Sequence, residues 1–309
     1  MEQKPVFQTF AISKQYKEFK ALDGVSMSIY EGDIYGFVGE NGAGKTTLIR
    51  LACGLIHETS GEFAIFGISN KDGAIGQARR RTASIVESVA VNRGLTAVEN
   101  LKLQCYLAGI NKTKEELNQI IADVGLDPKA IEKKKAGSFS LGMRQRLGLA
   151  IALISDPEFV LLDEPMNGLD PQGFVDMREA ILNLNKKGVT FLISSHILSE
   201  LDKICTRVGF LSHGHLLEEL SIDELHDKAR RKISIRVKDV DKVAKKIADG
   251  LKLKETKVEG EYFNIYDLVD INDVVKFLVE NKINVEGISS NEETIEDYYR
   301  QLMMKEPSL

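Results

Sequence analysis

Gly39-Glu-Asn-Gly-Ala-Gly44-Lys45-Thr46 follows the apolar stretch Asp33–Val38 and opens a helix that the sequence predicts over Thr46–Leu55. The pattern GxxxxGK[ST] between a buried strand and a helix is typical of a phosphate-binding loop. Its glycines allow successive backbone N–H groups to turn toward phosphate oxygens, and the start of a helix favours negative charge. Lys45 is predicted to neutralise the β- and γ-phosphates, and the Thr46 hydroxyl to bind Mg²⁺. The stretch therefore predicts an α/β fold with a nucleoside-triphosphate site.

Two carboxylates, Asp163 and Glu164, directly follow a strand predicted over Phe159–Leu162. In open α/β sheets, ligands bind at the carboxyl ends of the strands, which is where these two carboxylates lie. Asp163 is predicted to contact Mg²⁺ through oxygen, either directly or through a ligand of the metal, and Glu164 is predicted to be the base that activates an attacking water. Taken alone, an acidic pair here could be a helix cap, but the phosphate loop upstream favours the catalytic interpretation.

His196 follows a second strand, which the sequence predicts over Thr190–Ser194. A lone histidine is usually structural. Its position at the end of a strand in the same predicted sheet instead favours a contact with the γ-phosphate.

Composition limits the class of protein. The chain has 309 residues, a formal net charge of −5 and three widely spaced cysteines. The acidic balance argues against broad electrostatic binding of nucleic acid, and the cysteines fit packing positions in a reducing compartment. No stretch approaches the roughly 18 apolar residues of a membrane helix, and the start of the chain has no signal-peptide run. Any membrane role is therefore expected to need a separate partner chain.

The order of predicted elements indicates two domains, residues 1–222 and 223–309. In the first, strands are predicted at Val6–Phe10, Val25–Ile29 and Glu62–Phe66, helices at Lys114–Val124, Leu147–Ile154 and Gly173–Leu184, and a capping box at Thr96 and Glu99. In the second, the order βαββαβ is typical of a ferredoxin-like fold. Its elements are predicted at Ile233–Val237, Val240–Leu251, Leu253–Val258, Tyr262–Tyr266, Ile271–Asn281 and Val285–Ile288, with a trailing helix over Thr294–Met303.

Together these motifs resemble the ATP-binding subunits of ABC transporters, over about Val6–Ser221. Phe139-Ser-Leu-Gly-Met143 stands where the family has its LSGGQ signature, and it retains Ser140 and Gly142 while differing at the other three positions. Gly168-Leu-Asp170 resembles the D-loop. Tyr16 falls where the family stacks an aromatic ring on adenine, although a packed tyrosine is an alternative. Glu87 replaces the Q-loop glutamine, and an ionised glutamate only accepts hydrogen bonds.

The resemblance implies a P-loop NTPase of the ABC ATPase type, with a RecA-like core, an antiparallel β subdomain and a helical subdomain. It implies ATP and Mg²⁺ as cofactors and catalytic roles for Glu164 and His196. The implied ATP-binding residues are Tyr16, Asn41, Gly42, Ala43, Gly44, Lys45, Thr46, Thr47, Ser140 and Gly142, and the implied metal-binding residues are Thr46, Glu87 and Asp163.

The resemblance also implies partners. In the family, two ATPase domains enclose two ATP molecules, so this chain is expected to form a homodimer or to pair with a second ATPase subunit. The region Glu87–Leu107 is expected to contact an integral membrane permease, which would place the chain on the cytoplasmic face of the membrane. The C-terminal domain is expected to support dimerisation or partner contact.

The signature variant, Glu87 and the C-terminal extension resemble the bacitracin- and lantibiotic-resistance branch, with ABC-2-type exporters as relatives. This branch implies ATP-driven efflux of a peptide antibiotic, bacteriocin or other amphipathic compound. One alternative is an ABC-type ATPase acting on ribosomes or DNA, although such proteins commonly carry two ATPase domains or long coiled-coil insertions. Another is a regulatory subunit with little turnover, which Glu164 and His196 argue against and Glu87, Leu141 and Met143 weakly favour.

Overall fold

A computed structural model describes residues 4–87, 90–229, 231–238, 240–267, 269–292 and 295–304. The chain divides into two compact units, Met1–Ile222 and Asp223–Leu309, and each is described by itself. Within the described ranges, no helix combines the length and apolar character that crossing a membrane requires.

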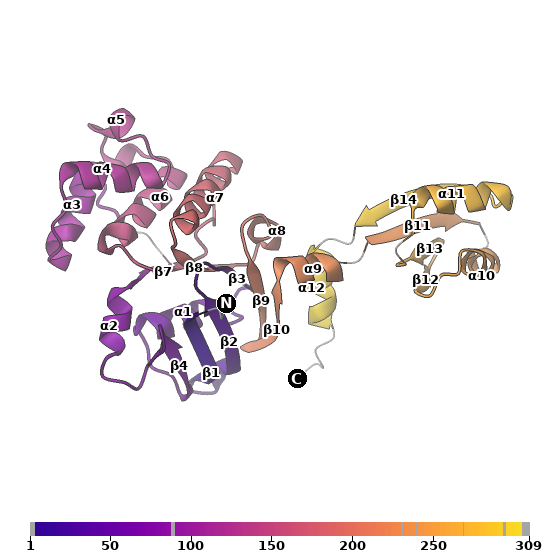
Figure 1. Cartoon of the computed structure of the whole chain (residues 1–309), viewed down its shortest axis with the longest axis horizontal. Coiled ribbons are helices and arrows are strands. Elements are labelled where there is room, and N and C mark those ends of the chain that lie inside the picture. Colours follow the sequence, from indigo (N-terminus) through magenta and orange to yellow (C-terminus); the bar gives the residue numbers. More distant parts are fainter. Residues whose placement is uncertain are drawn as a thin grey trace. The chain divides into compact units, whose positions relative to one another are not determined.

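A six-stranded sheet forms the centre of the first unit (Figure 1), in the order β10-β9-β3-β8-β7-β6. The strands β3, β6, β7, β8 and β9 pair in parallel, and β10 is antiparallel to β9. Their bounds are β3 Ile34–Val38, β6 Thr82–Ile85, β7 Phe159–Asp163, β8 Thr190–Ser195, β9 Arg207–Ser212 and β10 His215–Ser221. Every residue of β3, β7 and β8 is buried, as expected for central parallel strands.

An antiparallel sheet in the order β2-β1-β4-β5 forms a second layer. Its strands are β1 Pro5–Tyr16, β2 Phe19–Tyr30, β4 Ser60–Ile65 and β5 Ile68–Ser69. Helix α1, Lys45–Cys53, contributes buried side chains to a core shared by both sheets. In that core, the rings of Phe7 on β1 and Phe159 on β7 stack with centroids 6.0 Å apart. The phosphate-loop helix is thus held by both layers.

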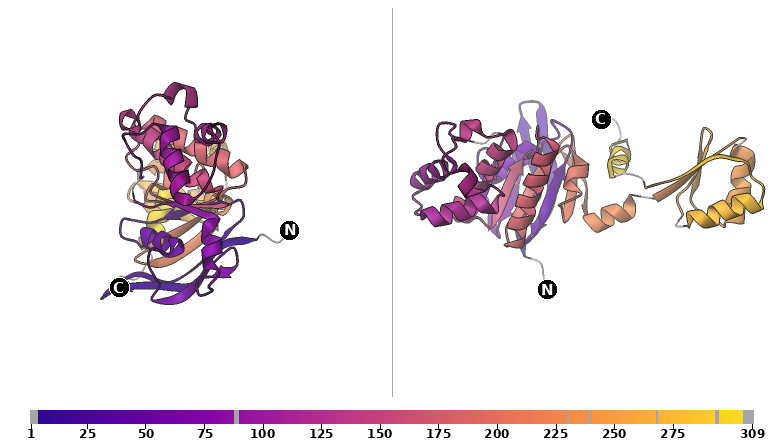
Figure 2. Two further views of the ribbon diagram at one scale, coloured as in Figure 1. Left: turned by 90° about the vertical axis from the view of Figure 1, so that its left-hand side faces the viewer. Right: turned by 90° about the horizontal axis from the view of Figure 1, so that it is seen from above.

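Helices α3 to α6 gather on one side of these sheets (Figures 1 and 2). The capping box predicted at Thr96 and Glu99 is confirmed at the start of α3, and Thr113 and Glu116 form another at the start of α4. The helical elements of this unit are α2 Ile75–Arg80, α3 Ala97–Ala108, α4 Lys114–Asp123, α5 Pro128–Ile131, η1 Ala136–Ser138, α6 Leu141–Ala152, η2 Leu153–Ser155, α7 Pro171–Lys186 and α8 Leu198–Leu201, and α9 Ile222–Lys228 follows at the boundary of the two units.

The second unit has the predicted βαββαβ order, in a sheet arranged β12-β13-β11-β14 with all neighbours antiparallel. Apolar residues alternate along β11, so Ile233 and Ile235 join Phe263 in a core with the two helices α10 and α11. The elements are β11 Arg231–Val237, α10 Val240–Gly250, β12 Thr256–Glu259, β13 Tyr262–Ile265, α11 Ile271–Glu280, β14 Val285–Glu292 and α12 Ile295–Met304. Thr294, the first residue of the predicted trailing helix, lies outside the described residues.

The predicted elements differ from the structure mainly at their ends. Strands β1 and β2 are longer than the predicted Val6–Phe10 and Val25–Ile29. Helix α6 begins at Leu141 and not at Leu147, because the Ser140 side chain caps it by accepting from the Met143 amide. Four strands are not among the predicted elements: β5, β6, β9 and β10.

Candidate active site

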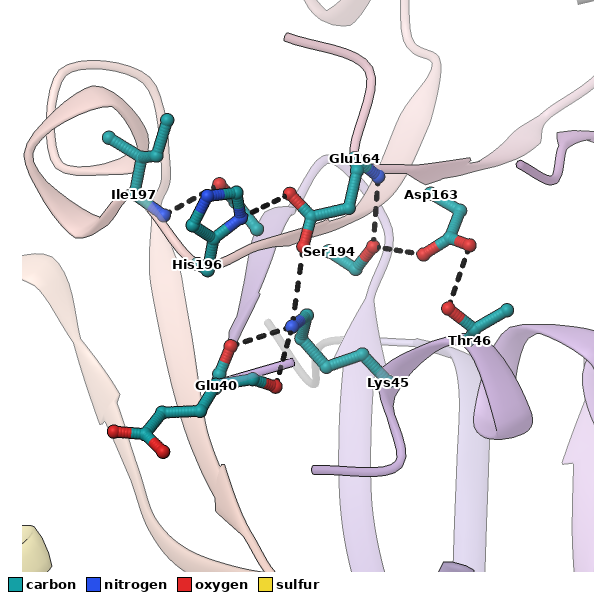
Figure 3. A network of polar contacts seen from close by, with 10 residues as sticks. Glu40, Lys45, Thr46, Asp163, Glu164, Ser194, His196 and Ile197 are labelled. Atoms are coloured by element: carbon teal, nitrogen blue, oxygen red, sulfur yellow. Dashed lines mark hydrogen bonds and ion pairs between the residues drawn. The ribbon is translucent and has the colours of Figure 1, made fainter. Parts of the chain in front are cut away.

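Three parallel strands bring the candidate residues to one edge of the six-stranded sheet. Val38, which precedes the phosphate loop, pairs with Ser195 at the end of β8, and Asp163 at the end of β7 pairs with Ser194. The loop, the acidic pair and His196 are therefore close in space although far apart in sequence. Figure 3 shows the resulting network of polar contacts.

The phosphate loop has a backbone that only glycine adopts without strain. Gly42 and Gly44 have φ of 86° and 113°, in the region that other residues avoid. A methyl group on Gly44 would lie 2.3 Å from the carbonyl oxygen of Ala21. Helix α1 begins immediately after it and has no acidic residue in its first turn. Because the first amides of a helix have no partner within it, this end of α1 suits an anion.

Lys45 is fixed by three oxygen atoms. Its Nζ donates to the carbonyl oxygens of Gly39, at 2.6 Å, and Glu40, at 3.0 Å, and lies 3.3 Å from Oε1 of Glu164. The residue is only 5% exposed, and a buried ammonium group is costly unless it is paired. The charge is thus held at the loop, where it would meet phosphate oxygens.

Thr46, Asp163 and Ser194 form a chain of hydrogen bonds. The Thr46 hydroxyl donates to Oδ2 of Asp163 at 2.8 Å, and the Ser194 hydroxyl donates to Oδ1 at 2.6 Å. A hydroxyl and a carboxylate that is largely buried are hard oxygen donors of the kind that Mg²⁺ prefers. The two side chains predicted to bind metal here are therefore in direct contact.

Glu164 connects Lys45 with His196. Its backbone has a positive φ of 48°, and its amide donates to the Ser194 hydroxyl at 3.1 Å. Oε2 lies 2.9 Å from Nδ1 of His196. Oε1 is buried and accepts no hydrogen bond from the residues that the structure describes. The contact that the structure gives this atom is its ion pair with Lys45.

Glu87 lies at the same edge but has a different partner. Ile85 pairs with Leu162 in the parallel register of β6 and β7, which brings the residues following both strands to neighbouring positions. The Glu87 carboxylate forms an ion pair with Arg50 on α1. Its described contact is thus to a cation on the phosphate-loop helix.

Tyr16, Ser140 and Gly142 lie away from the network of Figure 3. Tyr16 ends β1 with an exposed ring, and the ammonium of Lys14 lies 4.9 Å from its centroid. Ser140 caps α6. Gly142 is buried, and a methyl group there would lie 3.4 Å from Cα of Gly173 on α7. None of the contacts described for these residues is to the phosphate loop.

Sequence reasoning missed Ser194 and Arg50. Ser194 positions both Asp163 and the Glu164 amide, and its place at the end of a predicted parallel strand was an available signal. Arg50 lies one helical turn after Thr46, a spacing that places both on one face of α1. Nothing in the sequence pairs it with Glu87.

A family model described as ABC transporter matches residues 22–167. Among curated proteins, the bacitracin transport ATP-binding protein BcrA of Bacillus licheniformis is 39% identical over 304 residues, covering 96% of this chain and 97% of the relative. The lantibiotic transport ATP-binding protein SrtF of Streptococcus pyogenes is 37% identical over 214 residues, covering 69% of this chain and 89% of the relative.

Solved structures agree with this similarity. An ATP-binding cassette of an ABC transporter in its ADP conformation has a TM-score of 0.64 at 27% identity, covering 72% of this chain and 94% of that one. A nucleotide-free ATP-binding cassette has a TM-score of 0.63 at 26% identity, with coverage of 72% and 94%.

Proposed function

The chain belongs to the ATP-binding subunits of ABC transporters, a family whose members bind and hydrolyse ATP, and from this premise we propose that it powers export of a peptide antibiotic through a separate membrane subunit. The observation that carries the proposal is the extent of similarity to the bacitracin transport protein. The 304 aligned residues exceed the 222 of the first unit, so they reach into the second unit. Similarity confined to the first unit would support ATP hydrolysis but would be weaker support for a particular transported compound.

The site residues support a division of roles in hydrolysis. Lys45 would neutralise the phosphates, while Thr46 and Asp163 would hold Mg²⁺, with Glu87 as a further ligand to the metal or its water. When bound, the metal would supply charge stabilisation at the phosphates. Glu164 would accept a proton from the attacking water on its carboxylate, which contacts Lys45 through Oε1 and His196 through Oε2. His196, 2.9 Å from Oε2, would orient that carboxylate and contact the γ-phosphate.

The binding of ATP would extend over more of the chain. The loop residues Asn41, Gly42, Ala43 and Gly44 and the start of α1, including Thr47, would contact the phosphates, and Tyr16 would stack on adenine. These assignments follow the positions of the residues in the loop and at the end of β1.

The complete site would need two ATPase domains. Ser140 stands at the start of α6, whose first amides could face a phosphate. Together with Gly142 it would meet the phosphate loop of a second copy or of another ATPase subunit. This proposal fits the absence of any described contact between these residues and the chain's own loop.

The partner in the membrane would contact α3. This helix exposes three large apolar side chains, Leu103, Tyr106 and Leu107. A cluster of exposed apolar residues commonly marks a protein interaction surface. Contact through α3 would hold the chain at the cytoplasmic face of the membrane.

Bacitracin protection tests the proposal. The chain is expressed together with a membrane permease subunit in a sensitive host, and the inhibitory concentration of bacitracin is measured. Protection is expected with the natural chain and not with the Glu164→Gln variant made at equal level. An antibiotic that is not a peptide is the cargo control. Equal protection by both chains, or none against any peptide antibiotic, would contradict the proposal.

A further inference from the structure

Helix α1 contacts two neighbouring strand ends through residues one turn apart. Thr46 donates to Asp163 at the end of β7. Arg50, four residues later, pairs with Glu87 just beyond β6. Residues at this spacing lie on the same face of a helix. The phosphate-loop helix therefore holds two adjacent acidic positions at the same edge of the sheet.

This edge concentrates negative charge. Ile85 at the end of β6 pairs with Leu162 on β7. Glu87 follows β6 by two residues, and Asp163 and Glu164 follow Leu162 directly, so three carboxylates come at or just beyond the ends of two adjacent strands. Carboxylates at neighbouring strand ends are stabilised by nearby cations. Lys45 lies beside Glu164, and Arg50 lies beside Glu87. A glutamine at position 87 would be neutral and would not need such a cation.

Glu87 is also a residue whose side chain needs to be held. Its φ is 62°, a conformation that non-glycine residues adopt infrequently. Its side chain is 64% exposed, compared with 35% for Arg50, so little packing limits its rotamers. The ion pair uses Oε1 of the carboxylate. Oε2 is the oxygen that the pair leaves for a further ligand.

We propose that Arg50 is a positioning residue that holds the Glu87 carboxylate so that Oε2 faces Mg²⁺ or its bound water. The inference rests on the metal role proposed above for Glu87. It makes Arg50 and Glu87 one functional unit, in which the arginine is needed only while position 87 carries a charge.

Four chains test this unit: the natural chain, Arg50→Met, Glu87→Gln and the double variant. The measurement is the affinity for a fluorescent ATP analogue with Mg²⁺ and with EDTA, which needs no turnover. Arg50→Met is expected to weaken Mg²⁺-dependent binding about two- to fivefold, the range for an ion pair near the surface. The same substitution in the Glu87→Gln chain is expected to change it less than about 1.5-fold, since a neutral side chain forms no ion pair.

Controls separate charge from general damage. Arg50→Lys is expected to recover part of the loss. Arg81→Met removes another partly exposed ion pair, with Glu158, and should leave Mg²⁺-dependent binding unchanged. The inference would be overturned if Arg50→Met lowered Mg²⁺-dependent affinity equally in the natural chain and in the Glu87→Gln chain. It would also be overturned if the loss of affinity persisted in EDTA, or if Arg50→Met caused no loss of affinity. If Glu87→Gln itself leaves Mg²⁺-dependent binding unchanged, the metal role of Glu87 fails first, and the inference fails with it.

Discussion

Nδ1 of His196 lies 2.9 Å from Oε2 of Glu164, at the ends of adjacent strands of the central sheet. The same carboxylate lies 3.3 Å from Lys45 through its other oxygen. One acidic side chain is thus held between a ring nitrogen and a buried ammonium, and its backbone is held by Ser194. This support fixes the orientation of the carboxylate that is proposed to receive a proton from water.

Replacing Glu164 with glutamine is expected to lower ATP hydrolysis at least about 100-fold, because an amide cannot act as the general base. Binding of Mg-ATP should persist, since Lys45 and Thr46 are unchanged. Hydrolysis is measured as phosphate release, and the oligomeric state by size-exclusion chromatography with light scattering. A dimer that forms only with Mg-ATP is the expected result.

Glu158→Gln is the matched control, because Glu158 forms an ion pair with Arg81 just before β7, away from the network. It should hydrolyse ATP at the natural rate. Hydrolysis by Glu164→Gln within tenfold of this control would contradict the base assignment. If the Glu164→Gln variant is a dimer without nucleotide, the dimer interface does not depend on ATP.

Gly44→Ala should destabilise the first unit by about 2–5 kcal/mol, the sum of a left-handed backbone and a steric clash. The new methyl group would lie 2.3 Å from the Ala21 carbonyl oxygen. Gly67→Ala should cost only about 1–2 kcal/mol, because Gly67 has φ +76° and nothing within 4 Å of a new methyl group. Urea unfolding of both variants measures the difference in their free energies of unfolding. Similar decreases for the two variants would show that the clash at Gly44 is relieved.

The capping box of α3 should give the stability a defined dependence on pH. The Thr96 amide and then the Lys135 ammonium hold the pKa of Glu99 below its ordinary 4.5. A lowered folded-state pKa contributes stability above 4.5, and this contribution is lost as pH falls through the folded-state value. Glu99→Gln should therefore be less stable than the natural chain at pH 7, and the gap should narrow below pH 4.5.

Urea midpoints at several pH values measure this gap. Glu18→Gln is the control, since Glu18 is an exposed carboxylate on the turn between β1 and β2. A gap between Glu99→Gln and the natural chain that stays constant down to pH 3 would show that the carboxylate charge is not its source.

Tyr106→Glu should separate ATP hydrolysis from export. Tyr106 is 84% exposed on α3, so a charge there should leave folding and the hydrolysis rate of the isolated chain within about twofold, as is usual for surface changes. Co-purification with the membrane subunit and protection against bacitracin should be lost. Phe19→Glu, at an exposed position on β2, should retain both. Loss of export by both variants would indicate that α3 is not the specific contact.

Local patterns predicted the parts of the fold that depend on short segments. The phosphate loop, the acidic pair and each element of the βαββαβ order are recognisable from short runs of consecutive residues. The α/β fold and the family were predicted correctly. The contact of Thr46 with Asp163 followed because parallel strands end at one edge.

The remaining features depend on departures from regular patterns. Strand β1 was predicted too short because Ala11 has φ +46° and the register shifts between Thr9 and Ile12, which breaks the alternation of apolar residues. Strand β9 contains Gly209, where a methyl group would meet the Tyr35 hydroxyl, so its sequence lacks a continuous strand signal. The pairing of Arg50 with Glu87 spans 37 residues and depends on a helix meeting a strand end.

The distance along the chain between Thr46 and Asp163, 117 residues, has a consequence for synthesis. As the chain leaves the ribosome, the phosphate loop emerges long before its acidic partners, and His196 emerges later still. Contacts that need both the loop and the acidic pair can therefore form only after β7 has been synthesised, and those that need His196 only after β8.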